Sequence, residues 1–347
     1  MAKAIAPTIE TLLADGPAQT PFDIMRSAYA ELTVTDLEAA ERFYVDLLGL
    51  VVTLRTDDAL YLRGWSEQLH HSLVLSRAEV PACRRLSFRV RTERDLDALA
   101  AEFRRRGCQA RDVEGDLAGM GRALRVWDPF GYPLEFFHEM VTFESQLQRF
   151  DIQRGAPIMR LDHFNIHSPQ CEETFAFWQE LGFRCTEYIS TDGEPERLTG
   201  GWLARKQTVH DVALTAGRGP RLHHVGLYVA DPIGVLRACD QLAAAHRSQA
   251  IERGPGRHGV SNAFFVYLRD PDGHRIELYA CDYYTGDPDH RPLRWSLNDP
   301  RCRSFYGTHA PDSWYEESTF VLGPDGNVEP TREGAIDERE VRTEVMA

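Results

Sequence analysis

Two segments of the chain, Asp128-Pro-Phe-Gly-Tyr-Pro-Leu-Glu135 and Asp270-Pro-Asp-Gly-His-Arg-Ile-Glu277, repeat one pattern. In the second segment, Pro271 suits the first turn position of a type I turn, and Gly273 supplies the positive φ of the bulge that follows. Both segments therefore predict a β-hairpin, and their likeness predicts an internal duplication of the chain.

The sequence before each hairpin repeats as well. An alternating strand begins near Arg26 in one copy and near Arg160 in the other, and an amphipathic helix follows, with Gly49 or Gly182 as its stop signal. Later in each copy a histidine begins a further strand, and another helix precedes the hairpin. We therefore predict an α+β fold of two related modules, each built from β-α-β-β-β units.

The length of 347 residues, at roughly 150 residues per domain, also predicts about two domains. The predicted boundaries are an N-terminal extension at 1–24, the N-terminal module at 25–147, the C-terminal module at 158–281, a segment rich in aromatic residues and arginine at 282–322, and an acidic flexible tail at 323–347.

Acidic residues outnumber basic ones by 53 to 39, which gives a net charge of −14. This charge opposes binding to nucleic acid or to anionic membranes. The 7 cysteines include no Cys-x-x-Cys pair, and no stretch resembles a signal peptide or a transmembrane segment. We therefore expect a cytoplasmic protein with reduced thiols that binds neither nucleic acid nor membranes.

Two strands of the C-terminal module place histidines on an inner face, if side chains alternate strictly. In the first strand, one face holds Leu161, His163, Asn165 and His167, and the other holds Asp162, Phe164 and Ile166. In the second strand, His224 lies with Gly226 and Tyr228, whereas His223 shares a face with Val225, Leu227 and Val229, which we expect the helices to cover.

The second hairpin adds a carboxylate to this inner face. A three-residue loop pairs Asp270 with His274, and that register sets Tyr267 directly opposite Glu277. His163, His224 and Glu277 thus form a set of two histidines and one carboxylate, which suits Fe(II) or Mn(II) with open positions for substrate and O₂. Zinc is the second choice for such a set.

The duplication strengthens this prediction, because a single strand histidine or glutamate is usually structural. In the N-terminal module, the positions that match His163 and His224 hold Tyr29 and Arg85, and only the glutamate is retained, as Glu135. One module therefore keeps the scaffold without the full ligand set.

Several longer motifs resemble those of a known family. They are Arg160-Leu-Asp-His-Phe-Asn, Thr208-Val-His-Asp, Arg221-Leu-His-His-Val, Glu252-Arg-Gly-Pro-Gly-Arg-His-Gly-Val-Ser-Asn-Ala-Phe264 and Asp282-Tyr-Tyr-Thr-Gly-Asp-Pro-Asp289. With the duplicated modules, they resemble extradiol ring-cleaving dioxygenases of the vicinal oxygen chelate superfamily. The resemblance runs from about Arg26 to Asn327, and the loop 191–198 and the tail beyond Asn327 depart from it.

This resemblance implies two tandem vicinal-oxygen-chelate modules that form open barrels, with the metal site in the C-terminal module. It implies one Fe(II) or Mn(II) per chain, O₂ as co-substrate and a homotetramer. Within the family, the match implies cleavage of 3,4-dihydroxyphenylacetate (homoprotocatechuate) at the 2,3 bond to 5-carboxymethyl-2-hydroxymuconate semialdehyde, in aromatic catabolism.

The resemblance also assigns roles to individual residues. His210 matches the acid–base residue beside the O₂ position, Tyr267 a tyrosine that binds a catechol oxygen, and Asn165 and His258 further pocket residues. Arg253 and Arg303 match arginines that bind the substrate carboxylate, as expected for an anionic group. Trp202 matches an aromatic wall, and Trp314 an aromatic cover over the pocket. The metal ligands match His163, His224 and Glu277.

Three alternatives stay open. A different catechol could be the substrate of the same chemistry. A glyoxalase-like or epimerase-like enzyme would need no O₂, but it would place ligands in both modules, which Tyr29 and Arg85 oppose. A ligand-sequestering protein of the bleomycin-resistance type would need no metal, which the His, His, Glu set opposes.

Overall fold

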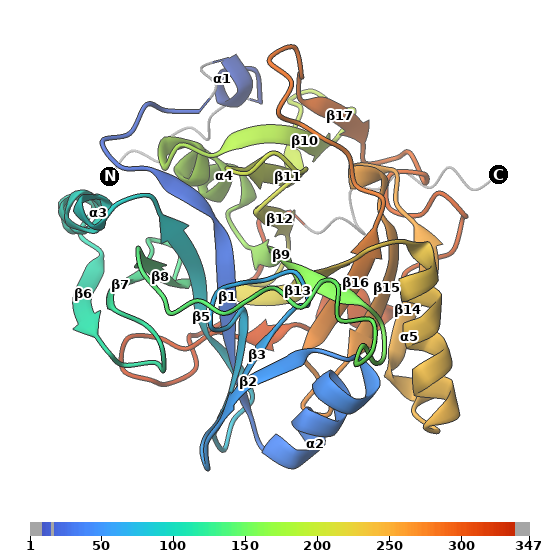
Figure 1. Cartoon of the computed structure of the whole chain (residues 1–347). Coiled ribbons are helices and arrows are strands. Elements are labelled where there is room, and N and C mark those ends of the chain that lie inside the picture. Colours follow the sequence, from blue (N-terminus) through green and yellow to red (C-terminus); the bar gives the residue numbers. More distant parts are fainter. Residues whose placement is uncertain (1–8, 15–16, 337–347) are drawn as a thin grey trace.

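The computed structural model describes residues 9–14 and 17–336, and within this part of the chain two curved sheets form the molecule (Figure 1). The first sheet contains β1 (Ile24–Val34), β2 (Val51–Arg55), β3 (Ala59–Arg63), β4 (Leu73–Arg77), β5 (Ala82–Val90), β6 (Gln109–Glu114), β7 (Arg122–Trp127) and β8 (Pro133–Phe137). The helices of this half are α1 (Ile9–Ala14), α2 (Leu37–Glu41) with a π-helical turn at Arg42–Leu47, and α3 (Glu93–Arg105).

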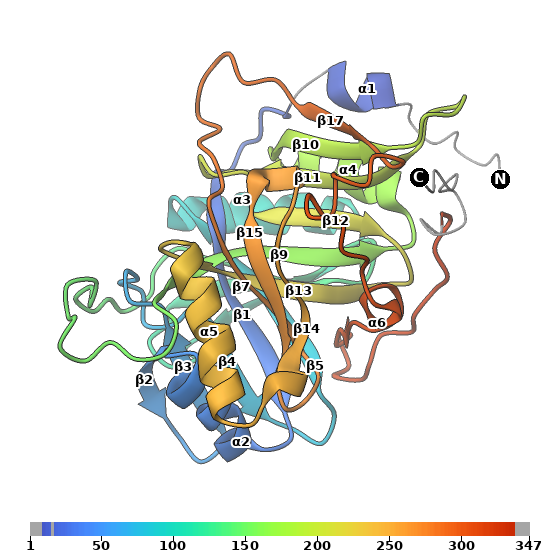
Figure 2. The ribbon, with the colours of Figure 1, turned by 90° about the vertical axis from the view of Figure 1, so that its right-hand side faces the viewer.

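The second sheet contains β9 (Ile158–Ser168), β10 (Arg184–Ser190), β11 (Leu198–Ala204), β12 (Val212–Ala216), β13 (Arg221–Val229), β14 (Ile251–Arg257), β15 (Phe264–Arg269), β16 (Arg275–Ala280), β17 (Leu293–Ser296) and β18 (Thr319–Phe320). Its helices are α4 (Cys171–Glu180), α5 (Pro232–Ala244) and α6 (Asp312–Glu316), with short 3₁₀ turns at Ser248–Ala250 and Val260–Asn262. Figure 2 shows α5 lying along the sheet beside β14 and β15.

Strand order confirms the duplication. The first sheet runs β2-β3-β4-β1-β5-β8-β7-β6, and the second runs β10-β11-β12-β9-β13-β16-β15-β14, with β17 added beside β10 and β18 beside β13. Each module therefore has the same topology, and in each the central pair, β1 with β5 or β9 with β13, is antiparallel. The predicted α+β fold of two tandem modules is correct.

The predicted hairpin register is also confirmed. The amide of Asp270 donates to the carbonyl of His274 over 3.0 Å, and Gly273 has a φ of +86°. Tyr267 lies opposite Glu277 on β15 and β16. The short loop thus brings a tyrosine and a carboxylate onto one face.

Strict alternation is wrong at two places, because each central strand contains an extra residue. Asp162 is unpaired between Leu161 and His163, and Leu161 therefore joins the apolar core with Phe164. His223 is likewise unpaired between Leu222 and His224, and its ring lies 4.5 Å from that of His167 instead of under the helices. Such bulges turn two consecutive side chains toward the same side of a strand.

The final described segment joins the two modules. Trp127 donates its indole N–H to the carbonyl of Leu322 over 3.0 Å, and Val321 bridges to Cys83, both in the N-terminal module. The chain then returns to the C-terminal module, where Arg332 bridges to Gly219 and Ile336 is 8% exposed. Arg332 also donates to the carbonyl of Phe130 in the N-terminal module over 2.8 Å, so the first part of the predicted tail, 323–336, contacts both modules. Residues 337–347 lie outside the described part.

No helix in the described ranges is long and apolar enough to cross a membrane. All seven cysteines are free thiols.

Candidate metal centre and substrate cavity

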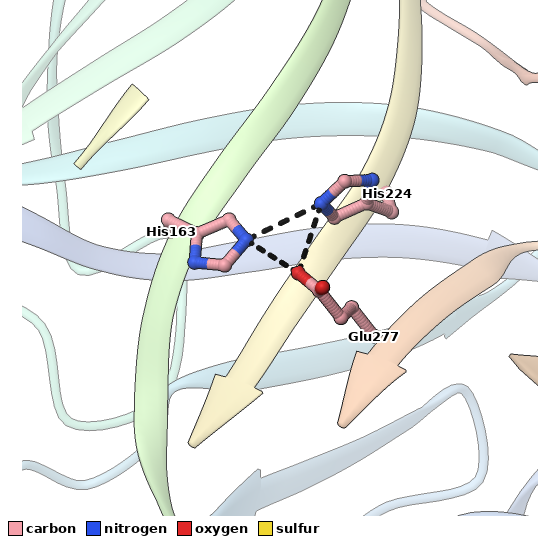
Figure 3. A group of neighbouring side chains, drawn as sticks. All are labelled: His163, His224 and Glu277. Carbon is pink, nitrogen blue, oxygen red and sulfur yellow. Dashed lines mark hydrogen bonds and ion pairs between the residues drawn. The ribbon is translucent and has the colours of Figure 1, made fainter. Parts of the chain in front are cut away.

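Three side chains on adjacent strands converge at the centre of the C-terminal module (Figure 3). His163 on β9 places its Nε2 3.2 Å from Nε2 of His224 on β13, and 2.9 Å from Oε2 of Glu277 on β16. The His224 and Glu277 atoms are 3.3 Å apart, and all three residues are buried. One nitrogen from each histidine and one carboxylate oxygen are thus gathered where a single metal ion could bind all three.

Gly226 on β13 makes room for this convergence. It is the cross-strand partner of His163 and also the partner of Glu277 in the parallel pair. A Cβ atom at this position would overlap the imidazole of His163. The absence of a side chain at Gly226 therefore leaves the space that the ligand ring occupies.

The protonation of two of the three groups fits a metal site. Burial lowers the pKa of His224 to about 4, so that its imidazole is neutral with a free lone pair at neutral pH. Burial would raise the pKa of Glu277, but hydrogen bonds with His163 and His224 hold it well below its usual range. Glu277 is therefore an anion, as a metal ligand must be. For the third group, His163, burial would lower the pKa, but hydrogen bonds with Asp162 and Glu277 raise it, so a metal ion would displace a proton from its ring.

His163 is oriented from behind by the bulge residue Asp162. Its Nδ1 lies 3.2 Å from Oδ2 of Asp162. Burial opposes ionisation of Asp162, yet Lys206, His163 and Arg160 hold the pKa of its carboxyl well below the usual range. A carboxylate on the remote nitrogen of a ligand histidine fixes the ring and directs Nε2 toward the metal position.

All the side chains that the sequence analysis proposed for the site line one cavity in the structure. These residues are His163, Asn165, Trp202, His210, His224, Arg253, His258, Tyr267, Glu277, Arg303 and Trp314. The cavity is also lined by Val260 and Ser261, which the sequence analysis did not single out. These two residues lie in a 3₁₀ turn without periodicity, and no signal in the sequence separates them from other loop residues.

His210 precedes β12 and faces the metal position. Its ring centroid is 3.9 Å from that of His163, and its Nδ1 is buried with no hydrogen-bond partner in the described residues. Burial, and then the neighbouring His163, hold its pKa well below the usual value, so the imidazole is neutral. Asn165, two residues after His163 on β9, accepts a hydrogen bond from the Thr215 hydroxyl over 3.3 Å.

Tyr267, His258 and the Arg303 carbonyl form a chain of hydrogen bonds beside Glu277. The Arg303 carbonyl lies 2.6 Å from Nδ1 of His258 and can only accept, so Nδ1 carries the proton. Nε2 of His258 must then accept from the Tyr267 hydroxyl, 2.9 Å away. Burial, and then the charge of Glu277, raise the pKa of Tyr267 well above its usual value.

Arg253 presents unmatched positive charge to the cavity. Its side chain is 5% exposed, and one Nη donates to the Arg303 carbonyl over 3.0 Å. Its Nε and other Nη are buried without a hydrogen-bond partner among the described residues, and its guanidinium lies 4.4 Å over the ring of Trp314. A buried guanidinium with two unused donors favours an anionic partner inside the cavity.

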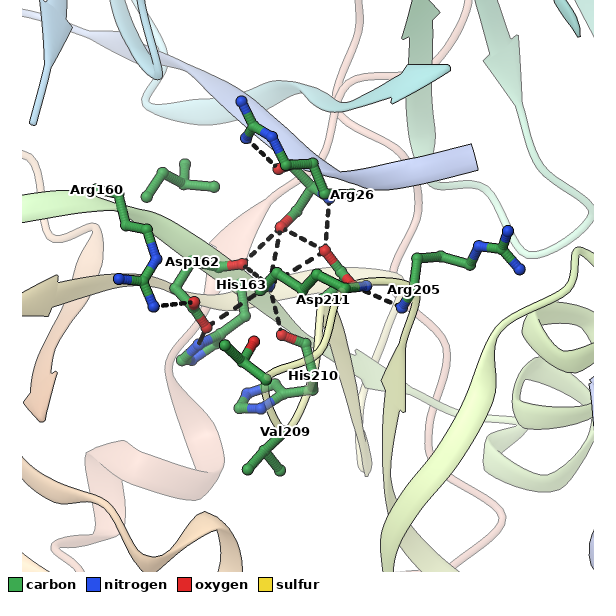
Figure 4. Close-up of polar contacts among 12 residues, drawn as sticks. Arg26, Arg160, Asp162, His163, Arg205, Val209, His210 and Asp211 are labelled. Carbon is green, nitrogen blue, oxygen red and sulfur yellow. Dashed lines mark hydrogen bonds and ion pairs between the residues drawn. The ribbon is translucent and has the colours of Figure 1, made fainter. Parts of the chain in front are cut away.

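A polar network under the site connects it to the N-terminal module (Figure 4). The amide of Ser27 on β1 donates to Oδ1 of Asp211 over 2.7 Å. The ammonium of Lys206 donates to that same oxygen over 3.1 Å and to the carbonyl of His210 over 2.6 Å, and it also reaches the carbonyl of Asp162. Lys206, which the sequence analysis did not identify, therefore ties the His210 strand to the His163 strand.

The equivalent positions of the N-terminal module hold ion pairs. Arg85 lies 2.9 Å from Glu31 and 3.5 Å from Glu135, and Glu135 also contacts Arg125 at 2.7 Å and the Tyr29 hydroxyl. The place of Gly226 is taken by Ser87, which pairs with both Tyr29 and Glu135. Charged side chains thus fill the space that the metal centre takes in the other module.

Comparison with known proteins also finds two modules in this chain. The model of the Glyoxalase/Bleomycin resistance protein/Dioxygenase superfamily matches residues 26–136 and 160–278. A substrate complex of homoprotocatechuate 2,3-dioxygenase from Brevibacterium fuscum superposes with a TM-score of 0.87 at 44% identity, over 95% of this chain and 99% of that one. The chain belongs to the extradiol ring-cleaving dioxygenases of this superfamily.

Other extradiol dioxygenases are similar over most of their length. A manganese-dependent 2,3-dihydroxybiphenyl 1,2-dioxygenase from Geobacillus genomosp. 3 is 30% identical, over 80% of this chain and 91% of its own. A metapyrocatechase from Geobacillus stearothermophilus is 29% identical, over 86% of this chain and 95% of its own. The chain is thus similar to extradiol dioxygenases whose names give different catechols.

Proposed function

We propose that this extradiol dioxygenase cleaves 3,4-dihydroxyphenylacetate at the 2,3 bond to give 5-carboxymethyl-2-hydroxymuconate semialdehyde. The observation that carries the choice of substrate is Arg253, a buried guanidinium with unused donors in the same cavity as the metal centre. A catechol with a carboxymethyl group brings the anion that this guanidinium lacks, and a catechol without one does not. Arg303, which lines the same cavity, would be the second cation for that carboxylate.

His163, His224 and Glu277 would hold Fe(II) or Mn(II). Their ligand atoms converge, and Gly226 leaves the space that the three side chains need. At neutral pH, His224 is neutral and Glu277 is an anion. A metal with two nitrogen ligands and one oxygen ligand from the protein supplies open positions for a catechol and O₂ together. The manganese-dependent relative supports Mn(II) as one choice.

The remaining cavity residues would orient the substrate and move protons. Tyr267, whose proton points to His258, would bind one catechol oxygen and exchange that proton along the same chain. His210, neutral and with a free nitrogen, would act as acid and base beside O₂, and Asn165 would help to position it. Trp202 and Trp314 would close the ring pocket and exclude water.

Oxygen uptake measured together with the appearance of the yellow ring-opened product tests the proposal. Protein loaded anaerobically with Fe(II) or Mn(II) is mixed with aerated 3,4-dihydroxyphenylacetate, catechol or 2,3-dihydroxybiphenyl, with metal-free protein and His163→Ala as controls. We expect stoichiometric uptake and product, with the highest kcat/KM for 3,4-dihydroxyphenylacetate. A higher kcat/KM for catechol or 2,3-dihydroxybiphenyl would instead assign the substrate that the names of the relatives suggest.

The arginines give a second, sharper readout. Arg253→Met should raise KM for 3,4-dihydroxyphenylacetate by about 10- to 100-fold, as expected for the loss of a charge-assisted hydrogen bond in a buried site. KM for catechol should change little, because that substrate carries no carboxylate. Equal losses on both substrates would contradict the role of Arg253 in carboxylate binding.

We further infer a cytoplasmic homotetramer from the family resemblance. Light scattering on the purified protein tests the assembly, and a mass of one or two chains would contradict it.

A further inference from the structure

His223 lies between a metal ligand and the helix that covers the cavity. Its ring is 1% exposed and is turned to this side of β13 by the bulge. Its Nδ1 is 2.7 Å from Nδ1 of His224, and its Nε2 is 3.1 Å from the carbonyl oxygen of Trp314 on α6. One imidazole thus contacts both the remote nitrogen of His224 and the backbone of α6.

The chemistry of these atoms fixes where each proton lies. The Trp314 carbonyl can only accept, so Nε2 of His223 must donate. Nδ1 of a neutral His223 is then an acceptor, and the proton between the two rings must belong to Nδ1 of His224. His224 with its proton on Nδ1 has its lone pair on Nε2, the atom that faces His163 and Glu277.

We propose that His223 is a positioning residue that holds His224 in its metal-binding tautomer and couples it to α6 through the Trp314 carbonyl. The inference rests on the proposed function, because it takes His224 as a ligand. Partners on the remote nitrogen of a ligand histidine orient the ring and raise its basicity. For His163 this partner is the Asp162 carboxylate, whereas for His224 it is an imidazole that also contacts the backbone of α6.

The rest of α6 is held by different bonds. Arg275 donates to the Ser313 carbonyl over 2.9 Å, and the Ser313 hydroxyl donates to Glu252 over 2.7 Å. Neither of these bonds touches a metal ligand. His223 therefore links the backbone of Trp314 to the remote nitrogen of His224 by hydrogen bonds, in addition to the ring contacts that His224 and Tyr267 make with Trp314.

The N-terminal module supplies a matched control. Its bulge residue at the place of His223 is Arg84, which pairs with Glu31 at 3.1 Å. No ligand histidine follows it, since the next residue is Arg85. A change at Arg84 disturbs an equivalent bulge without touching the His224 chain.

Metal affinity tests the first half of the inference. Mn(II) dissociation constants are measured by competition with a fluorescent chelator for wild type, His223→Phe, His223→Gln and Arg84→Gln. Phe keeps the ring without its nitrogens and should weaken binding by about 10- to 100-fold. Gln, which offers both a carbonyl and an N–H, should stay close to wild type, as should Arg84→Gln.

Hydrogen exchange of the metal-free proteins tests the second half. Amides of 312–317 should exchange about fivefold faster in His223→Phe than in wild type, as expected for one lost hydrogen bond. His223→Gln should restore slow exchange. Because no metal is present, this readout does not depend on the proposed function.

The outcomes separate the two claims. If wild type binds Mn(II) and His223→Phe binds it with the same affinity, the positioning of His224 by His223 is overturned and the proposed function stands. Unchanged exchange of 312–317 in His223→Phe would overturn the coupling to α6. Wild type that binds neither Mn(II) nor Fe(II) would overturn the proposed function and the ligand half of the inference. If His223→Phe does not fold, ¹⁵N-histidine spectra of wild type decide: a proton on Nδ1 of His223 would overturn the chain.

Discussion

The two modules share one topology but stabilise their centres in opposite ways. In the N-terminal module, Tyr29, Arg85 and Glu135 neutralise one another by ion pairs and hydrogen bonds. In the C-terminal module, the same positions hold His163, His224 and Glu277, whose three ligand atoms lie within 4.8 Å of one another with no arginine in the set. The comparison teaches that one scaffold serves for stability when its charges are matched within the protein, and for ligand binding when they are left unmatched.

The largest expected effect comes from replacing, one at a time, the glutamates at equivalent positions of the two modules, Glu277 and Glu135. Glu277→Gln should reduce ring cleavage by more than about 100-fold, because a metal ligand loses its charge. This loss exceeds the one expected for residues that only hydrogen-bond to a metal ligand. Glu135→Gln should leave activity per bound metal nearly intact but lower the melting temperature, because Arg85 and Arg125 lose their buried partner. Metal content, activity and thermal unfolding of both variants check this. Activity loss in Glu135→Gln at full metal content would break the comparison.

The next effect concerns the space around the ligands. Gly226→Ala should weaken Mn(II) binding by about 10- to 100-fold, because the new Cβ displaces the His163 ring that Asp162 orients. Ser87→Gly, the reverse change at the equivalent place, should leave metal affinity unaltered. Chelator competition measures both. Unchanged affinity in Gly226→Ala would show that the His163 ring can move aside.

A smaller effect is expected at the contact between the modules. Lys206→Met removes the ammonium that joins the carbonyls of His210 and Asp162, and should lower kcat by about tenfold with little change in KM. Glu67, at the matching position of the N-terminal module, accepts from the Leu161 amide over 3.2 Å, and its hydrogen-bond partners in the described ranges do not line the cavity. Glu67→Gln should therefore affect stability and not kcat. Equal kcat values for Lys206→Met and wild type would reduce the network to a structural role.

The smallest effect concerns Asp128, which opens the hairpin of the N-terminal module. Burial raises the pKa of Asp128 to about 7, whereas its ordinary value is 3.8, so the folded state holds an extra proton between these pH values. Stability from this group is therefore present at low pH and lost as pH rises from about 4 to 7. Asp128→Asn cannot titrate, and its melting temperature should fall less than that of wild type between pH 5 and pH 8. A larger fall in the variant would contradict the raised pKa.

The fold and the three metal ligands could be predicted from local patterns in the sequence, whereas the other cavity residues could be named only from the family resemblance. The Pro271 and Gly273 turn fixes its hairpin register, and the register places Tyr267 opposite Glu277. The duplicated strand order followed from the repeated segments, and the proposed cavity residues are gathered in one place.

The remaining features could not be predicted, because they depend on extra residues and backbone groups. A bulge inserts one residue without changing composition, so the alternating pattern gave the wrong side for Leu161 and His223. Lys206 donates hydrogen bonds to the backbone carbonyls of His210 and Asp162. Because every residue has such a carbonyl, the sequence does not show which ones Lys206 will contact. The contacts of 323–336 with both modules likewise depend on the assembled surface.

The path of the last described segment sets an order in which the protein can mature during synthesis. All three ligand positions lie before residue 281, whereas Trp314 and the crossing from Cys83 to Gly219 are made by residues 314–332. Because the ribosome delivers the chain from its N-terminus, the metal-binding strands can assemble while the cavity still lacks its cover. A chain released after residue 310 would therefore keep all three ligand residues but lack Trp314 over the cavity.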